Sequence, residues 1–210
     1  MIRIKVCGIT NERDALRAVK LGVDALGFIF AESPRKVSPE VVEKIVSLLP
    51  PFIGRVGIFV NEDKEKVRKI AQACFLTSLQ FHGEEPPFYC QEFKWKVIKS
   101  FRVKDRGILR EISRYKVDAY LLDTYCIDKR GGTGRTFDWE VAKEIRKLGV
   151  PVILSGGLNP ENVVQAIIKV RPYAVDVSSG VEREKGKKDY QKLRDFVRKI
   201  RRQDELLSTT

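Results

Sequence analysis

Short runs of β-branched and other apolar residues alternate along the chain with longer segments whose apolar residues recur every three or four positions. The short runs predict strands over Ile2–Cys7, Ala25–Phe30, Arg55–Val60, Ser78–Phe81, Lys96–Phe101, Ala119–Asp123, Val152–Leu154 and Ala174–Val177. The longer segments predict helices over Glu12–Leu21, Pro39–Leu48, Lys64–Cys74, Ile108–Tyr115, Trp139–Leu148 and Pro160–Val170, with a weaker pattern over Pro86–Phe93. Helix caps are expected at Asn11, Ser38 and Asn159.

This alternation is typical of parallel strands that are joined by right-handed helical crossovers. Eight such units close a barrel, so we predict an α/β fold with a single (β/α)8 TIM barrel, a parallel eight-stranded barrel with outer helices. A doubly wound open sheet is the alternative, but its GxGxxG motif is absent because the first strand continues into Gly8-Ile9-Thr10. The barrel domain is expected over residues 1–202, with 203–210 as a C-terminal tail that could be disordered.

The composition supports one ordinary globular domain. The chain has 210 residues and a mass of 24.0 kDa, with 43% hydrophobic and 32% charged residues, which argues against disorder, a coiled coil or a fibre. No apolar run is long enough for a membrane span, and the N-terminal residues lack the pattern of a signal peptide. We therefore expect a cytoplasmic protein that does not associate with membranes.

Charge and metal-ligand content narrow the function further. The net charge of +12 favours phosphorylated or polyanionic partners, although basic residues between 187 and 202 have the helical spacing of a solvated amphipathic face. The single histidine, His82, argues against histidine-based metal sites, so we predict no metal. Reduced thiols are expected because no metal-binding spacing or disulfide framework connects Cys7, Cys74, Cys90 and Cys126.

Chemistry in a (β/α)8 barrel lies at the carboxyl ends of the strands, where this chain has a cysteine and an aspartate. Cys7 ends the first strand on the same face as Arg3 and Lys5, and we expect it to point into the barrel mouth because the apolar residues of the other face would contact the outer helices. The nearby positive charge would lower the thiol pKa and favour a thiolate base or nucleophile. The alternative is a small buried hydrophobe. Asp123 ends the sixth strand, where apolar surroundings would raise its pKa and suit a general acid; a loop-capping aspartate is the alternative.

Two glycine-rich segments predict a phosphate site. Ser155–Pro160 follows the seventh strand and Ser178–Glu182 follows the eighth, and these two loops form the recurrent phosphate site of such barrels. Two glycine turns without a ligand are the alternative. In the second loop, Arg35 suits a planar carboxylate, although a surface role is the more common one.

Six motifs in order resemble one family of enzymes, phosphoribosylanthranilate isomerase of tryptophan biosynthesis. The resemblance covers Ile2 to Phe196 and is carried by Lys5-Val6-Cys7-Gly8-Ile9-Thr10, Gln80-Phe81-His82-Gly83, Leu121-Leu122-Asp123-Thr124, Gly131-Gly132-Thr133-Gly134 with Phe137-Asp138-Trp139, Ser155-Gly156-Gly157-Leu158, and Asp176-Val177-Ser178-Ser179-Gly180-Val181-Glu182. Each motif is short, but their shared order at the expected strand ends is highly specific.

The resemblance implies an Amadori rearrangement of N-(5-phosphoribosyl)anthranilate to 1-(2-carboxyphenylamino)-1-deoxyribulose 5-phosphate, without a metal or organic cofactor. It implies Asp123 as the acid that protonates the ribose ring oxygen and Cys7 as the base that removes the C2 proton. Arg35 would meet the anthranilate carboxylate, with Lys36 as its rival, and Asp128 is a rival acid. The further substrate-binding residues are then His82, Gly132, Gly156, Gly157, Asp176, Ser178, Ser179 and Gly180.

Two other functions stay open. Another phosphosugar barrel is one, such as a pentulose-phosphate epimerase or an indole-forming enzyme of the same pathway, although epimerases usually need metal-binding histidines. A basic nucleic-acid-binding protein is the other, but no stacking or helix-turn-helix pattern supports it. We expect a phosphorylated small-molecule substrate and no nucleic acid; a homodimer is possible and cannot be derived from the sequence.

Overall fold

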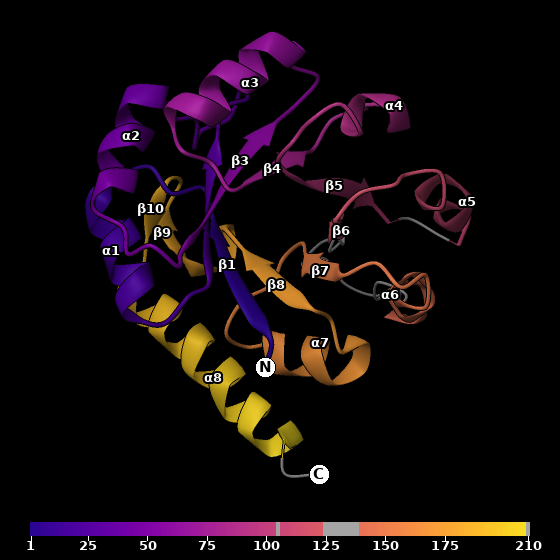
Figure 1. Ribbon diagram of the computed structural model, residues 1–210. Helices are drawn as coiled ribbons and strands as arrows, with labels where there is room; N and C mark the ends of the chain where they lie inside the picture. The colour runs from indigo at the N-terminus through magenta and orange to yellow at the C-terminus, as the bar shows by residue number, and fades with distance from the viewer. Residues whose placement is uncertain (104–105, 124–138, 209–210) are drawn as a thin grey trace.

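The computed structural model describes residues 1–103, 106–123 and 139–208 and contains a closed eight-stranded barrel of parallel strands (Figure 1). The strands follow one another around the barrel in chain order, and the last pairs with the first. They are β1 Arg3–Cys7, β2 Ala25–Ile29, β3 Gly54–Phe59, β4 Ser78–Phe81, β5 Lys96–Arg102, β6 Ala119–Asp123, β7 Val152–Ser155 and β8 Ala174–Val177. The predicted (β/α)8 barrel is confirmed, and the doubly wound alternative is wrong.

Helices surround the barrel. They are α1 Glu12–Lys20, α2 Pro39–Ser47, α3 Lys64–Ala73, α4 Pro87–Cys90, α5 Ile108–Ile112, α6 Trp139–Arg146, α7 Val163–Val170 and α8 Tyr190–Ser208. After β8 the chain forms the 3-10 helix η1 Ser179–Val181 and a short antiparallel hairpin of β9 Glu182–Glu184 and β10 Lys187–Lys188. Among the described residues, no helix is both long enough and apolar enough to cross a membrane.

The three predicted helix caps, Asn11, Ser38 and Asn159, agree with the structure to different degrees. Asn11 caps α1 as expected, because its side chain accepts a hydrogen bond from the Asp14 N–H at 2.9 Å. Ser38 precedes α2 but accepts no capping hydrogen bond. Asn159 accepts from the N–H groups of Glu161 and Asn162, which makes a turn and delays the start of α7 to Val163.

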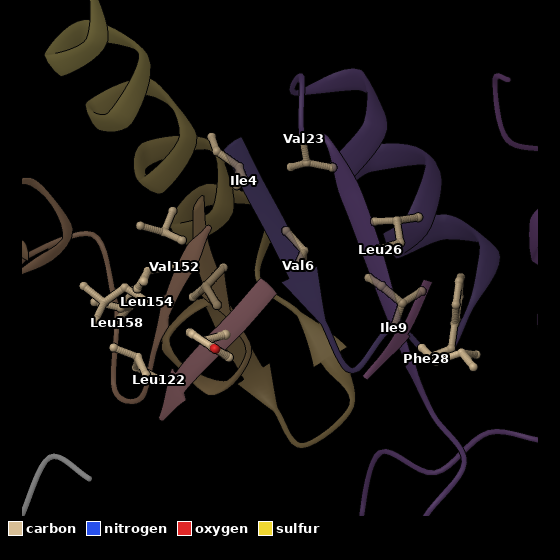
Figure 2. Packing of buried hydrophobic residues seen from close by; sticks show 14 of the residues in the cluster. Ile4, Val6, Ile9, Val23, Leu26, Phe28, Leu122, Val152, Leu154 and Leu158 are labelled. Atoms are coloured by element: carbon tan, nitrogen blue, oxygen red, sulfur yellow. The ribbon is translucent and has the colours of Figure 1, made fainter. Parts of the chain in front are cut away.

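Alternation along the strands divides the interior into two layers of packing. Ile4 and Val6 point outward into the large core between strands and helices, part of which Figure 2 shows, and Val6 lies opposite Leu26 of the neighbouring strand β2. The opposite face of each strand points into the barrel, where a smaller cluster includes Cys7. The period-two pattern of β1 therefore predicted correctly that Cys7 faces the inside of the barrel.

Residues 203–208 belong to a helix, whereas we predicted a C-terminal tail over 203–210 that could be disordered; residues 209 and 210 lie outside the described residues. Helix α8 continues to Ser208, and the buried Asp204 accepts two hydrogen bonds from the Ile2 N–H, at 2.8 and 3.0 Å. Arg201 donates to the Ile2 carbonyl at 2.7 Å. These bonds attach the end of α8 to the start of β1, so the helix persists beyond residue 202.

Replacing Asp204 tests this attachment. We expect Asp204→Ala to lower the free energy of unfolding by about 1–3 kcal/mol, because it leaves the Ile2 N–H without its acceptor in a buried position. Urea unfolding followed by circular dichroism measures the change. Arg202→Ala, at an exposed position of the same helix, is the control and should change stability by less than about 0.5 kcal/mol. Equal effects of the two substitutions would contradict the attachment.

Candidate active site

A cavity of about 360 Å³ opens at the carboxyl ends of the strands, where chemistry was expected. The predicted residues that line it come from six different strand ends or loops: Cys7, Arg35, His82, Asp123, Gly156, Gly157, Asp176, Ser178 and Ser179. Gly180 follows Ser179 in η1 but does not line the cavity. Gly132, like the rival acid Asp128, lies outside the described residues. The structure therefore assembles one site from segments that are far apart in sequence.

Cys7 lies at the end of β1, above a buried ion pair. Lys5 is two residues earlier on the same face, and its Nζ donates to Asp176 Oδ1 at 2.9 Å. Burial raises the pKa of the Cys7 thiol; the positive charges of Lys5 and Lys188 oppose this rise, and the negative charge of Asp176 adds to it. The expected lowering of the thiol pKa is therefore wrong, because the desolvation of a thiolate outweighs the nearby positive charge.

Asp123 lies across the cavity and faces the only histidine in the chain. Its Oδ2 is 3.5 Å from His82 Nε2, and the Asp123 side chain keeps a third of its surface exposed. His82 Nδ1 is in turn 3.1 Å from Gln80 Nε2, which also donates to Ser100 Oγ at 3.2 Å. If Gln80 donates to Nδ1, the imidazole hydrogen lies on Nε2 and faces Asp123.

Gln80 and Ser100 were not singled out by the sequence analysis. A signal was present, because Gln80 and His82 are two residues apart on one strand and so share a face. Ser100 could not be connected to them without the pairing of β4 with β5.

Arg35 extends over the cavity mouth and is held by a carboxylate. Its Nε and Nη2 donate to the two oxygens of Glu182 at 2.8 and 2.7 Å, a bidentate geometry. Lys188 Nζ donates to Glu182 Oε1 at 2.9 Å and to the Cys7 carbonyl at 2.7 Å. Lys36, the rival of Arg35, is paired with Glu32 and is not among the residues that line the cavity.

Gly8 makes the position of Arg35 possible. A Cβ at this residue would lie 2.6 Å from Arg35 Cδ, and the backbone has φ of +72°. Both conditions favour glycine, because a side chain at residue 8 would strain the backbone and collide with the Arg35 side chain. Glu182 and Lys188 were missed by the sequence analysis because they come from the hairpin after β8, whose position depends on barrel closure.

The predicted phosphate loops lie side by side at the rim. Gly156 and Gly157 have φ of +87° and +63°, a left-handed conformation that suits glycine. A Cβ at Gly180 would lie 1.9 Å from the Leu158 carbonyl oxygen, so the two loops are in direct contact. Helix α7 starts only at Val163, and the helix that begins beside the cavity is η1 at Ser179. This is the short extra helix that accompanies phosphate sites in such barrels.

The fold and the site define a (β/α)8-barrel enzyme whose cavity combines a thiol, a carboxylate and two glycine-rich loops. Residues 4–199 match the model of the family described as N-(5'phosphoribosyl)anthranilate (PRA) isomerase. The N-(5'-phosphoribosyl)anthranilate isomerase of Trichlorobacter lovleyi is 50% identical over 199 residues, which are 94% of this chain and 97% of the relative. The chain belongs to the phosphoribosylanthranilate isomerase family, as its motifs implied, and is an isomerase of tryptophan biosynthesis.

Solved structures agree with this assignment. The phosphoribosyl anthranilate isomerase of Thermotoga maritima has a TM-score of 0.89 and 45% identity, with 96% of this chain and 99% of that chain covered. A second isomerase structure, in complex with reduced 1-(o-carboxyphenylamino)-1-deoxyribulose 5-phosphate, has a TM-score of 0.87 and 43% identity over the same shares. These likenesses run through the whole barrel.

The Glu182 carboxylate is expected to stabilise the rim in a pH-dependent way. Burial alone would raise its pKa, but hydrogen bonds from Arg35 and the charge of Lys188 outweigh burial, so the pKa is lowered. A lowered folded-state pKa means that the stabilisation is complete above the unfolded value of 4.5 and is lost as pH falls through the folded value. We expect Glu182→Gln to cost about 3–5 kcal/mol at neutral pH, since two cations lose their counter-charge.

Urea unfolding of wild type and Glu182→Gln over a series of pH values measures this difference. The difference in unfolding free energy between the two proteins should narrow below the unfolded pKa of 4.5, because protonation of Glu182 then removes from wild type the charge that the variant lacks. Glu32→Gln, which removes the exposed partner of Lys36, is the matched control and should cost no more than about 1 kcal/mol. A difference that stays constant at acidic pH would argue against a lowered pKa.

Proposed function

We propose that Asp123 and Cys7 perform the two proton transfers of the Amadori rearrangement of N-(5-phosphoribosyl)anthranilate. The observation that carries this proposal is that both side chains, from the ends of β6 and β1, line one cavity. Protonated Asp123 gives its proton to the ribose ring oxygen as the ring opens and the Schiff base forms. The Cys7 thiolate then removes the proton from sugar C2, and the resulting enol becomes the ketone without a further catalyst.

His82 and Gln80 would orient the acid. A hydrogen on His82 Nε2 faces Asp123 Oδ2 and would leave the other carboxyl oxygen to carry the proton toward the substrate. Gln80 is almost fully buried, which supports a fixed imidazole ring. This chain of contacts fits an acid whose orientation matters for proton transfer.

Arg35 would bind the anthranilate carboxylate. Glu182 accepts from Nε–H and from one Nη2–H, so the two hydrogens of Nη1 and the second hydrogen of Nη2 can still donate to the substrate carboxylate. Its place in the cavity lining, which Lys36 lacks, favours Arg35 over its neighbour. Glu182 then holds the arginine in one orientation before the substrate arrives.

The phosphate would lie on the backbone N–H groups of Gly157, Ser179 and Gly180, between the loops after β7 and β8. Support comes from the contact between these loops and from the relative whose bound ligand is a deoxyribulose 5-phosphate. His82, Gly132, Gly156, Asp176 and Ser178 stay predictions as additional substrate-binding residues. The absence of a nucleic-acid partner and the cytoplasmic location also stay predictions.

A homodimer is the remaining proposal about partners. A phosphoribosylanthranilate isomerase of Thermotoga maritima is described as dimeric. In this chain Phe52 and Phe75 are strongly exposed on the loops that precede β3 and β4, at the amino-terminal end of the barrel. Aromatic residues, including Phe, are enriched at protein–protein interfaces.

Conservative variants test the two catalytic roles. We expect Cys7→Ser and Asp123→Asn each to lower kcat by about 10²–10⁴-fold while the fold is retained, because each removes one proton transfer. The loss of anthranilate-type fluorescence from substrate generated in place measures turnover. Cys74→Ser and Asp118→Asn, which alter the same residue types outside the cavity, are the controls and should keep near wild-type kcat. Full activity in either cavity variant would refute that residue's role.

Inorganic phosphate tests the anion site separately from catalysis. It should inhibit wild type competitively, raising KM and leaving kcat unchanged, because it occupies the position of the substrate phosphate. Gly157→Ala should weaken this inhibition by about tenfold, since a strained left-handed backbone misplaces the N–H groups. Sodium chloride of equal ionic strength is the control. Inhibition by both salts to the same extent would mean screening rather than a phosphate site.

A further inference from the structure

Lys5 is a buried charge that the two proton transfers do not use. It lies on the inner face of β1, two residues before Cys7, and its side chain is only 4% exposed. Its partner Asp176, 6% exposed, lies opposite it in the register of β1 with β8. Asp176 lines the active-site cavity, whereas Lys5 is not among the lining residues and lies within the barrel beneath it.

A gain in folding stability does not by itself explain why this ion pair is present inside the barrel. Apolar residues of similar volume in place of a buried pair are often neutral or stabilising. Lys99, equally buried, shows the usual structural use of such a lysine: it donates to the Gly83 carbonyl at 2.6 Å and to Glu85 at 2.9 Å, and so holds the loop after β4. In the described part of the chain, the hydrogen bond of Lys5 Nζ goes to Asp176 rather than to a loop.

Cys7 is surrounded by charges from several elements. Lys5 comes from the same strand, Asp176 from β8 and Lys188 from β10, and Arg35 extends from the loop after β2. Lys188 and Arg35 share the carboxylate of Glu182, which offsets their charge. His82 and Asp123 line the same cavity on its other side. Lys5 is the cation two residues before Cys7 on the inner face of the same strand, and its positive charge opposes the rise of the thiol pKa.

We propose that Lys5 is a positioning residue whose ammonium stabilises the Cys7 thiolate, with Asp176 as its partner when the thiol is protonated. This inference rests on the proposed role of Cys7 as the base. When the sulfur is anionic, the ammonium lies between two anions; when the sulfur has taken the C2 proton, Asp176 alone balances it. The lysine therefore always has a counter-charge, and no buried charge is left alone during turnover.

The ionisation of Cys7 can be measured without turnover. Alkylation by iodoacetamide requires the thiolate, and mass spectrometry of the Cys7 peptide separates its rate from those of the other cysteines. The rate is followed from neutral to alkaline pH in wild type, Lys5→Met and Asp176→Asn. Lys5→Met should raise the thiol pKa by about one unit or more and so lower the rate at neutral pH about tenfold, whereas Asp176→Asn should lower the pKa.

Lys99→Met is the matched control, because it removes an equally buried lysine–carboxylate pair with the same 2.9 Å separation. It should leave the Cys7 pKa unchanged even where stability falls. If Lys5→Met does not fold, the double variant Lys5→Met with Asp176→Asn leaves neither charge unpaired. Its Cys7 pKa should be higher than that of Asp176→Asn alone, because these two variants differ only in the positive charge of Lys5.

The outcomes separate this inference from the role of Cys7 itself. An unchanged Cys7 pKa in a folded Lys5 variant, or an equal change in Lys99→Met, would overturn the inference even if Cys7→Ser is inactive. A raised pKa in the Lys5 variant together with full activity of Cys7→Ser would uphold the electrostatic role and refute the base. In the expected case, the pH profile of kcat/KM moves to higher pH with the thiol pKa in Lys5→Met.

Discussion

The parallel pairing of β1 with β8 is the interaction on which the rest of the molecule depends, because it closes the barrel. It joins segments more than 170 residues apart and sets Lys5 opposite Asp176. An open sheet would leave Cys7 at an edge and the phosphate loops at the far side. The hydrogen bonds from Ile2 to α8 secure the start of β1 and so support the same closure.

Closure of the barrel also buries charged side chains. They form two sets of ion pairs, one inside the barrel and one at its rim. Inside the barrel, Lys5 and Asp176 balance each other below the thiol. At the rim, Glu182 lies between Arg35 and Lys188, and Lys188 also bonds to the Cys7 carbonyl. Because buried ions are stable only when they are paired, these contacts give the cavity a defined charge pattern around the sulfur. A doubly anionic substrate then meets cations that are already oriented.

Much of the candidate site could be predicted because the carboxyl ends of the strands can be located from the sequence pattern. The period of two placed Cys7 inside the barrel, and the end of β6 placed Asp123 on the same rim. The direction of the thiol pKa could not be predicted, since it depends on how much water the closed barrel excludes. Gln80, Ser100, Glu182 and Lys188 were missed for a related reason: their importance comes from neighbours on other strands.

The sequence by itself determined the kind of fold, most of the elements, the family and the candidate catalytic residues, because alternation, periodicity and short motifs are local properties of the chain. Tertiary structure alone decided which charges meet. The pairings Lys5–Asp176 and Arg35–Glu182, and the attachment of α8 to β1, each join residues more than 140 positions apart. Their energies depend on distance and burial, and both arise only when the barrel closes.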